Sequence, residues 1–115
     1  MGIRTIVDLA LGESPNMPAG DMVYLRYPLG GGSGNESWVL SGALLTTAHL
    51  IRNRVPTLIH CQVGRNRSAA IAAGAISLAT QKSPDECLAL VANCREIDVG
   101  HSMWKSVVEA ADRLR

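Results

Sequence analysis

Short apolar runs alternate along the chain with longer stretches of mixed character. Residues 3–9 and 22–27 are short runs rich in apolar and β-branched side chains, and residues 57–61 form a near-continuous apolar run. Runs of this length, bounded by glycine, proline and asparagine, are typical of β-strands. A near-continuous apolar run is expected of a strand at the buried centre of a parallel sheet. The pattern therefore predicts three strands.

The longer stretches predict four helices. They cover residues 37–52, 67–80, 83 to about 95 and 102–114. The second is rich in alanine, so this helix can lie close to the sheet and to its neighbours. The third begins with a capping box that has proline at the first helical position. The alternating order of strands and helices predicts an α/β fold with a mostly parallel sheet.

Two helices carry apolar side chains that the sequence assigns to the core. In the first helix these residues are Trp38, Leu44, Leu45 and Ile51. In the third helix Cys87 and Cys94 are seven positions apart, on one face, and this spacing favours a buried position for both. The alternative for the cysteine pair is a redox role, because the thioredoxin-coupled arsenate reductases add a similar resolving pair to an oxyanion loop.

Composition limits the kind of protein. The chain has 115 residues, of which 47% are hydrophobic and 18% charged, with a formal net charge of +1. We therefore expect a single domain over residues 1–115 with a modest core, and neither nucleic acid nor membrane as a partner. Three cysteines without a secretory leader indicate a reducing compartment, and we expect a cytoplasmic protein. Oligomeric state cannot be inferred from the sequence.

One motif carries the candidate chemistry, between the third predicted strand and the helix that follows it. It reads His60-Cys61-Gln62-Val63-Gly64-Arg65-Asn66-Arg67-Ser68. Five residues that join a strand to a helix must curl, and such a curl turns backbone N–H groups inward to form an anion site. The N-terminus of the helix adds partial positive charge. The residues expected to supply the phosphate-binding amides are Gln62, Val63, Gly64, Arg65, Asn66 and Arg67.

Side chains of the motif then suggest a reaction. Free cysteine titrates near ~8.5, but thiols at helix N-termini or beside cations fall to roughly 3.5–7.5, so Cys61 is predicted to be a nucleophilic thiolate. Arg67 would hold two phosphoryl oxygens with its planar guanidinium. Ser68 would donate to the sulfur as it leaves, and His60 would orient the loop. The alternative is a buried structural cysteine beside a surface arginine.

The motif resembles the signature of the cysteine-dependent protein tyrosine phosphatases, and its context, HCQVGRNRSAA, looks like the dual-specificity branch. The resemblance covers residues 3–110. It implies a three-layer α/β fold in which helices flank a central sheet, with a shortened N-terminus relative to the family. It also implies hydrolysis of a phosphorylated protein, or another phosphomonoester, through a phosphocysteine and without a metal or cofactor.

The chain departs from the family where the general acid is expected. Relatives usually place an aspartate on the loop after the second strand, but here that loop reads Tyr27-Pro28-Leu29-Gly30-Gly31-Gly32. A positioned acid contributes about 10²–10⁴-fold. Three interpretations stay open: Glu36 replaces the acid, the enzyme is slow and prefers good leaving groups, or the protein is a phosphate-binding pseudophosphatase. Asp98 is a further candidate acid or water-positioning residue.

A different substrate class is also open. Relatives that act on phosphoinositides often carry basic residues within the signature loop, and Arg65 is such a residue whereas Gln62 is not. A phosphoinositide phosphatase is therefore an alternative to a protein phosphatase. Arg65 is explained equally by steering of anionic substrates.

Overall fold

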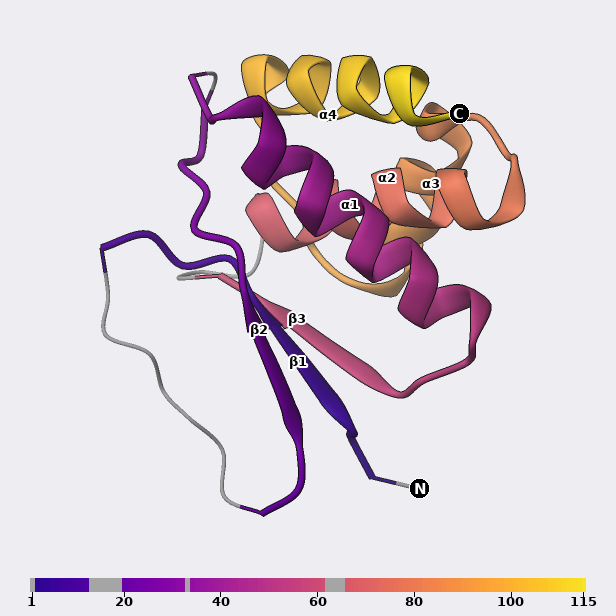
Figure 1. Cartoon of the computed structure of the whole chain (residues 1–115). Helices are drawn as coiled ribbons and strands as arrows, with labels where there is room; N and C mark the ends of the chain where they lie inside the picture. The colour runs from indigo at the N-terminus through magenta and orange to yellow at the C-terminus, as the bar shows by residue number, and fades with distance from the viewer. Residues whose placement is uncertain (1, 13–19, 33, 62–65) are drawn as a thin grey trace.

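A computed structural model describes residues 2–12, 20–32, 34–61 and 66–115 of the chain. The elements are, in order, β1 (Thr5–Asp8), β2 (Val23–Arg26), α1 (Ser37–Arg52), β3 (Thr57–His60), α2 (Arg67–Thr80), α3 (Pro84–Cys94) and α4 (His101–Leu114) (Figure 1). Each strand and helix that the sequence predicts is present, with ends within two residues of those expected. The α/β class is therefore confirmed.

The three strands form one parallel sheet in the order β2-β1-β3. Asp8, at the end of the central strand, pairs in register with Arg26 on one side and His60 on the other. Because parallel strands end at the same edge of a sheet, these three residues lie together at its carboxyl edge. Cys61 follows directly from this edge. Ligands of open α/β sheets bind at this edge, outside the carboxyl ends of the strands.

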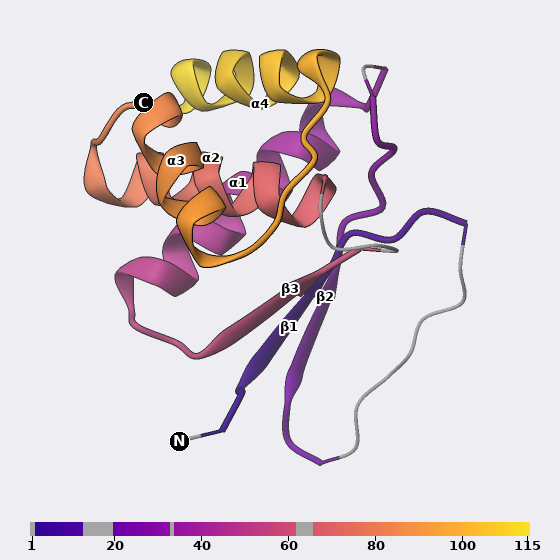
Figure 2. The ribbon, with the colours of Figure 1, turned by 180° about the vertical axis from the view of Figure 1, so that it is seen from behind.

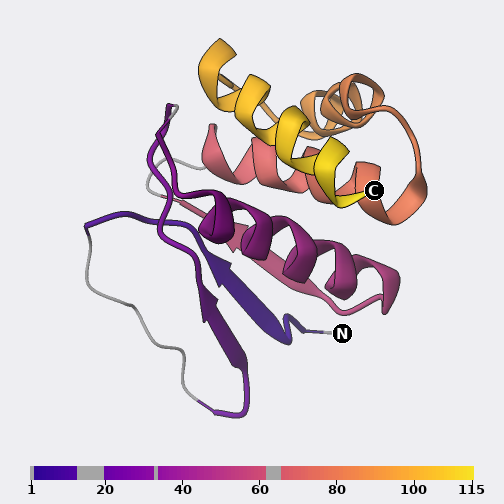
Figure 3. The ribbon, with the colours of Figure 1, turned by 45° about the horizontal axis from the view of Figure 1, so that its top comes forward.

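Figures 2 and 3 show the four helices grouped on one side of the sheet. Helix α2 contacts α1, α3 and α4. Its small residues make this possible, because a Cβ placed on Gly74 would lie 2.7 Å from Cγ1 of Val107 and 2.8 Å from Cδ2 of Leu44. The close approach of α1 and α4 to α2 therefore depends on the absence of a side chain at position 74.

The core face of α1 differs in part from the sequence prediction. Its buried residues are Leu40, Ala43, Leu44, Thr47 and Ala48, which follow one helical stripe. Leu44 and the half-buried Ile51 belong to this stripe, as expected. Trp38 and Leu45 do not, and they are 72% and 47% exposed, so the prediction that they face the core is wrong. The hydrophobic spacing alone did not separate the stripe from its neighbours.

The cysteines of α3 also differ from each other. Ser83 caps the helix as predicted, accepting a hydrogen bond at Oγ from the backbone N–H of Glu86 at 3.2 Å. Cys87 is fully buried, and burial raises the pKa of its thiol. Cys94 is exposed. The predicted core position is therefore wrong for Cys94, because the last turn of α3 has no buried residue. Within the described part of the chain, no helix has the length and hydrophobicity that a membrane span requires.

Candidate active site

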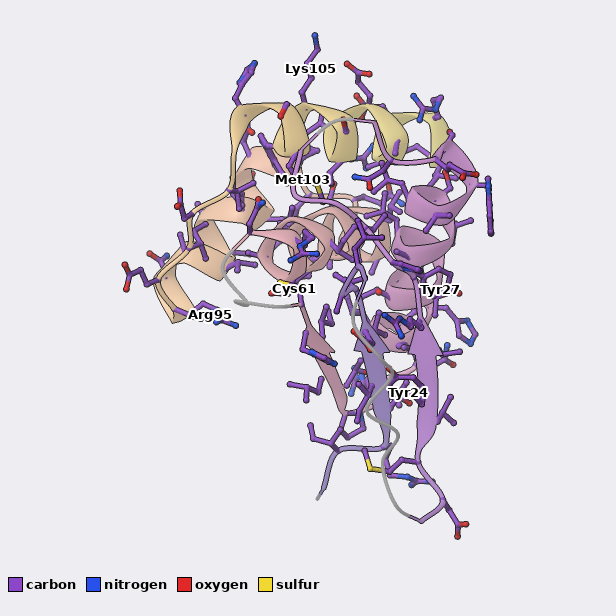
Figure 4. The ribbon with its side chains drawn as sticks, turned by 90° about the vertical axis from the view of Figure 1, so that its left-hand side faces the viewer. Tyr24, Tyr27, Cys61, Arg95, Met103 and Lys105 are labelled. Carbon is purple, nitrogen blue, oxygen red and sulfur yellow. The ribbon has the colours of Figure 1, made fainter. Side chains whose placement is uncertain are left out.

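The candidate site lies where β3 ends and α2 begins, at the carboxyl edge of the sheet. Cys61 comes directly after β3 and is 7% exposed. Figure 4 shows it at the end of that strand, next to α2. Arg67 is the first residue of α2. The intervening residues 62–65 lie outside the described residues, so the amide cradle expected from Gln62, Val63, Gly64 and Arg65 stays a prediction.

Arg67 connects the start of α2 to the segment that follows β2. Its Nη1 donates a hydrogen bond to the backbone carbonyl of Leu29 at 2.8 Å. Leu29 is fully buried, so packing of its side chain holds this carbonyl in place. A guanidinium has five N–H donors in a planar arrangement. The contact with Leu29 therefore sets the plane in which Arg67 can present donors to an anion.

Ser68 is buried in the first turn of α2. Only 3% of it is exposed, and its hydroxyl oxygen has no hydrogen-bond partner among the described residues. A buried hydroxyl without a partner is costly, by about 1–3 kcal/mol. A polar group without a partner among the described residues could bond to a group that changes charge during a reaction, and the helper role of Ser68 stays a prediction.

The side chain of His60 lies next to a buried carboxylate, that of Asp8. Its Nε2 lies 3.4 Å from Oδ1 of Asp8. The same oxygen accepts the backbone N–H of Ala10 at 2.9 Å, and Oδ2 accepts the hydroxyl of Tyr24. Burial by itself would raise the pKa of Asp8, but these two hydrogen bonds and the positive charges of His60 and Arg26 more than offset it, so the pKa is lowered. Asp8 is thus an ionised anchor for His60.

Sequence reasoning did not identify Asp8 as part of this site. The available signal was its position, because Asp8 ends a predicted strand at the edge where a parallel sheet binds ligands. The anchor depends on strand order, since β1 and β3 are neighbours only because β1 is central. Nothing in the local sequence around residue 60 shows this.

Asn66, which the sequence assigned only a backbone role, also uses its side chain. Its Nδ2 donates to the carbonyl of Gly31 at 2.9 Å, and its Oδ1 accepts the backbone N–H of Gly100 at 3.3 Å. The β2–α1 connection and the α3–α4 connection therefore both meet the residue before Arg67. These are the two segments in which the sequence places candidate acids.

The two candidate acids are not equivalent. Glu36 is exposed and precedes α1, and its carboxylate accepts a hydrogen bond from the indole N–H of Trp38. Asp98 is exposed in the α3–α4 connection, two residues before the contact between Gly100 and Asn66. The structure thus ties the segment of Asp98 to the site, whereas the carboxylate of Glu36 is directed to its own helix. Among the described residues, no group of histidine, cysteine, aspartate and glutamate could hold a metal ion.

No family model and no curated protein matches this chain. Solved structures do match. Human DUSP28 is 18% identical with a TM-score of 0.83, covering 98% of this chain and 80% of its own. A mouse putative dual specificity phosphatase, solved with zinc tungstate, is 21% identical with a TM-score of 0.83, covering 98% and 72%.

A third similar structure is the human tyrosine phosphatase-like serine/threonine/tyrosine-interacting protein. It is 18% identical with a TM-score of 0.80, covering 99% of this chain and 80% of its own. At these identities the likeness concerns the fold. The chain therefore has the fold of the dual-specificity phosphatases.

Proposed function

We propose that this protein is a cysteine-dependent phosphomonoester hydrolase of the dual-specificity or tyrosine phosphatase type. The observation that carries the proposal is the placement of Cys61 and Arg67. Cys61 directly follows β3 and Arg67 begins α2, with five residues between them, at the carboxyl edge of a sheet with the dual-specificity phosphatase fold. A phosphate bound between them would meet a thiol, a guanidinium and a helix N-terminus at once.

In the proposed reaction the thiolate of Cys61 attacks the phosphorus atom. A sulfur–phosphorus bond forms, the bond to the leaving-group oxygen breaks, and that oxygen takes up a proton. Water then attacks the phosphocysteine, inorganic phosphate leaves, and the thiolate is restored. Arg67 holds the equatorial oxygens in both steps, and the hydroxyl of Ser68 donates to the sulfur as it departs.

The substrate class depends on whether the site can supply a proton to the leaving-group oxygen. Residues 27–35 contain no aspartate, so good leaving groups, which need little protonation, should react best. We therefore propose aryl phosphates, of which phosphotyrosine in a cytoplasmic protein is the natural representative. Asp98 is the candidate donor for poorer leaving groups, because its segment meets Asn66 through Gly100.

The test compares the hydrolysis of para-nitrophenyl phosphate with that of an alkyl phosphate. Cys61→Ser should abolish turnover of both, since the nucleophile is lost. Cys94→Ser is the matched control, because Cys94 is exposed on α3 and is no part of the site. Turnover that persists unchanged in Cys61→Ser would refute the proposed mechanism.

A phosphate-binding module without turnover is the second candidate. Two observations favour it: residues 30–32 are three glycines where an acid is expected, and one similar structure is a tyrosine phosphatase-like interacting protein. Saturable binding of inorganic phosphate that is lost in Arg67→Ala, with no hydrolysis of either ester, would establish this candidate. The phosphoinositide alternative rests on Arg65, which lies outside the described residues.

A further inference from the structure

The side chain of Asn66 links three segments that are distant in the sequence. It donates from Nδ2 to the carbonyl of Gly31 at 2.9 Å and accepts at Oδ1 from the backbone N–H of Gly100 at 3.3 Å. A carbonyl can only accept and a backbone N–H can only donate, so the orientation of the amide is determined by its partners. Asparagine has the required donor and acceptor on one short side chain, whereas serine, aspartate and alanine do not offer both in this geometry.

The absence of a side chain at Gly31 leaves room for the amide of Asn66. A Cβ at position 31 would lie 3.0 Å from Nδ2 of Asn66, which is closer than nearly all real Cβ contacts. The backbone of Gly31 is not in the left-handed region. A side chain at position 31 would therefore push the neighbouring amide away by a few tenths of an ångström, whereas the backbone of residue 31 itself does not require glycine.

The segment around Gly31 is fixed from two further directions. The side chain of Asn35 accepts the N–H of Gly30 at 2.7 Å and donates to its carbonyl at 3.2 Å. Arg67 donates to the carbonyl of Leu29 at 2.8 Å. Asn66 and Arg67, at the start of α2, thus contact two nearby residues of the β2–α1 connection, Gly31 and Leu29. A shift of this connection at Leu29 would move the carbonyl that the Arg67 guanidinium contacts.

We propose that Asn66 is a positioning residue, which holds Gly31 and Gly100 at fixed places so that Arg67 is preset to receive phosphate. This inference rests on the proposed function. Its consequence is a coupling between Asn66 and Gly31. Loss of the amide frees the connection, and a methyl group on residue 31 displaces the amide, so both changes break the same contact.

The experiment is a double-mutant cycle with Asn66→Ala and Gly31→Ala. Each single variant should raise the KM for para-nitrophenyl phosphate and the Kd for inorganic phosphate by roughly tenfold, which is less than the ~10²-fold that a displacement on the order of 1 Å can cost. The double variant should be no worse than either single variant. The midpoint of thermal unfolding should be unchanged, which separates positioning from a structural role.

Gly30→Ala is the matched control. A Cβ there meets only ordinary contacts, at 3.6 Å to Asn35 and 3.8 Å to Leu11. Its effect, whatever its size, should be the same in the wild type and in Asn66→Ala. Additive effects of Gly31→Ala and Asn66→Ala would overturn the proposal.

The outcomes also separate this inference from the proposed function. A wild type that binds phosphate without turnover refutes the hydrolase but still tests Asn66 through the Kd. A wild type that binds or hydrolyses while Asn66→Ala behaves identically refutes only the role of Asn66. Absence of both phosphate binding and turnover in the wild type refutes both proposals.

Discussion

The two sides of the candidate site are built differently. On the nucleophile side, where β3 meets α2, three of the described residues are buried: Cys61, Ser68 and Asp8, whose carboxylate lies next to His60. The leaving-group side consists of glycines at positions 30–32 and of the exposed acids Glu36 and Asp98. One side is formed by the packing of the core, whereas the other is kept in place by a few side-chain hydrogen bonds.

The difference separates the steps of the proposed reaction that depend on groups placed by the fold from the step that depends on an exposed acid. Binding of an oxyanion and attack by sulfur need groups that the fold itself places at the edge of the sheet. Protonation of the leaving group needs an acid at a defined point, and the two candidates, Glu36 and Asp98, are both exposed. We therefore expect substitutions on the nucleophile side to have large effects and those at Glu36 to have small ones.

After Cys61→Ser, which should abolish turnover, the largest of these effects is expected for Arg67→Lys. Lysine keeps the charge but loses the planar set of donors that reaches Leu29 and, in the proposed mechanism, would hold two phosphoryl oxygens at the same time. Removal of one preorganised donor to a developing charge costs about 10²–10³-fold, and kcat/KM for para-nitrophenyl phosphate should fall by that order. Steady-state kinetics measure it directly.

Arg52→Lys is the control for Arg67→Lys. Arg52 likewise donates from a guanidinium nitrogen to a backbone carbonyl, that of Leu78 at 2.8 Å, but it lies at the end of α1. Its substitution should leave kcat/KM unchanged. Equal effects of the two substitutions would show that the nucleophile side gains nothing from Arg67 beyond packing.

The sequence was sufficient for features that are local. Hydrophobic spacing gave the strands and helices, and the motif from His60 to Ser68 directed attention to one strand-to-helix junction, which the structure places at the carboxyl edge of the sheet. It was insufficient for contacts between distant segments. The pairs Asp8 with His60 and Asn66 with Gly31 depend on the strand order and on how α2 meets the β2–α1 connection.

The errors in the core prediction have a related cause. Trp38 and Leu45 are apolar residues on an amphipathic helix, yet they lie outside the stripe that faces α2. Cys94 has the spacing of a core residue but follows the part of α3 that is covered. In each case the residue type was right for a core, but the residue lies at a position that no neighbouring element of the described chain covers.

A smaller effect, on stability, is expected for Asp8→Asn. The substitution removes the charge that holds His60, and loss of a hydrogen-bonded buried charge costs roughly 1–3 kcal/mol. Because the folded pKa of Asp8 lies below its usual value, the stabilisation is complete above about pH 3.9, the ordinary aspartate pKa, and is lost as the pH falls through the folded pKa. Denaturant unfolding of the wild type and the variant, at neutral pH and across this acidic range, measures the loss of stability and its dependence on pH.

The control for Asp8→Asn is Asp112→Asn. Asp112 is an exposed carboxylate that pairs with Arg115 at 3.3 Å on the surface of α4 and the C-terminus. Surface ion pairs contribute little, so this variant should match the wild type at every pH. A difference between wild type and Asp8→Asn that does not shrink in acid would contradict the role of Asp8 as an ionised anchor.

The smallest effect is expected for Glu36→Gln. Glutamine keeps an oxygen that can accept the indole N–H of Trp38, and a surface substitution of this kind usually changes a free energy by less than about 0.5 kcal/mol. Hydrolysis rates for para-nitrophenyl phosphate and for an alkyl phosphate should therefore both stay within about twofold of the wild type. If Glu36 were the general acid, the alkyl phosphate alone would lose about 10²–10⁴-fold. That outcome would mean that the Glu36 carboxylate leaves Trp38 when substrate binds. The acid on the leaving-group side would then be brought into position by the substrate, whereas the nucleophile side is in position before substrate binds.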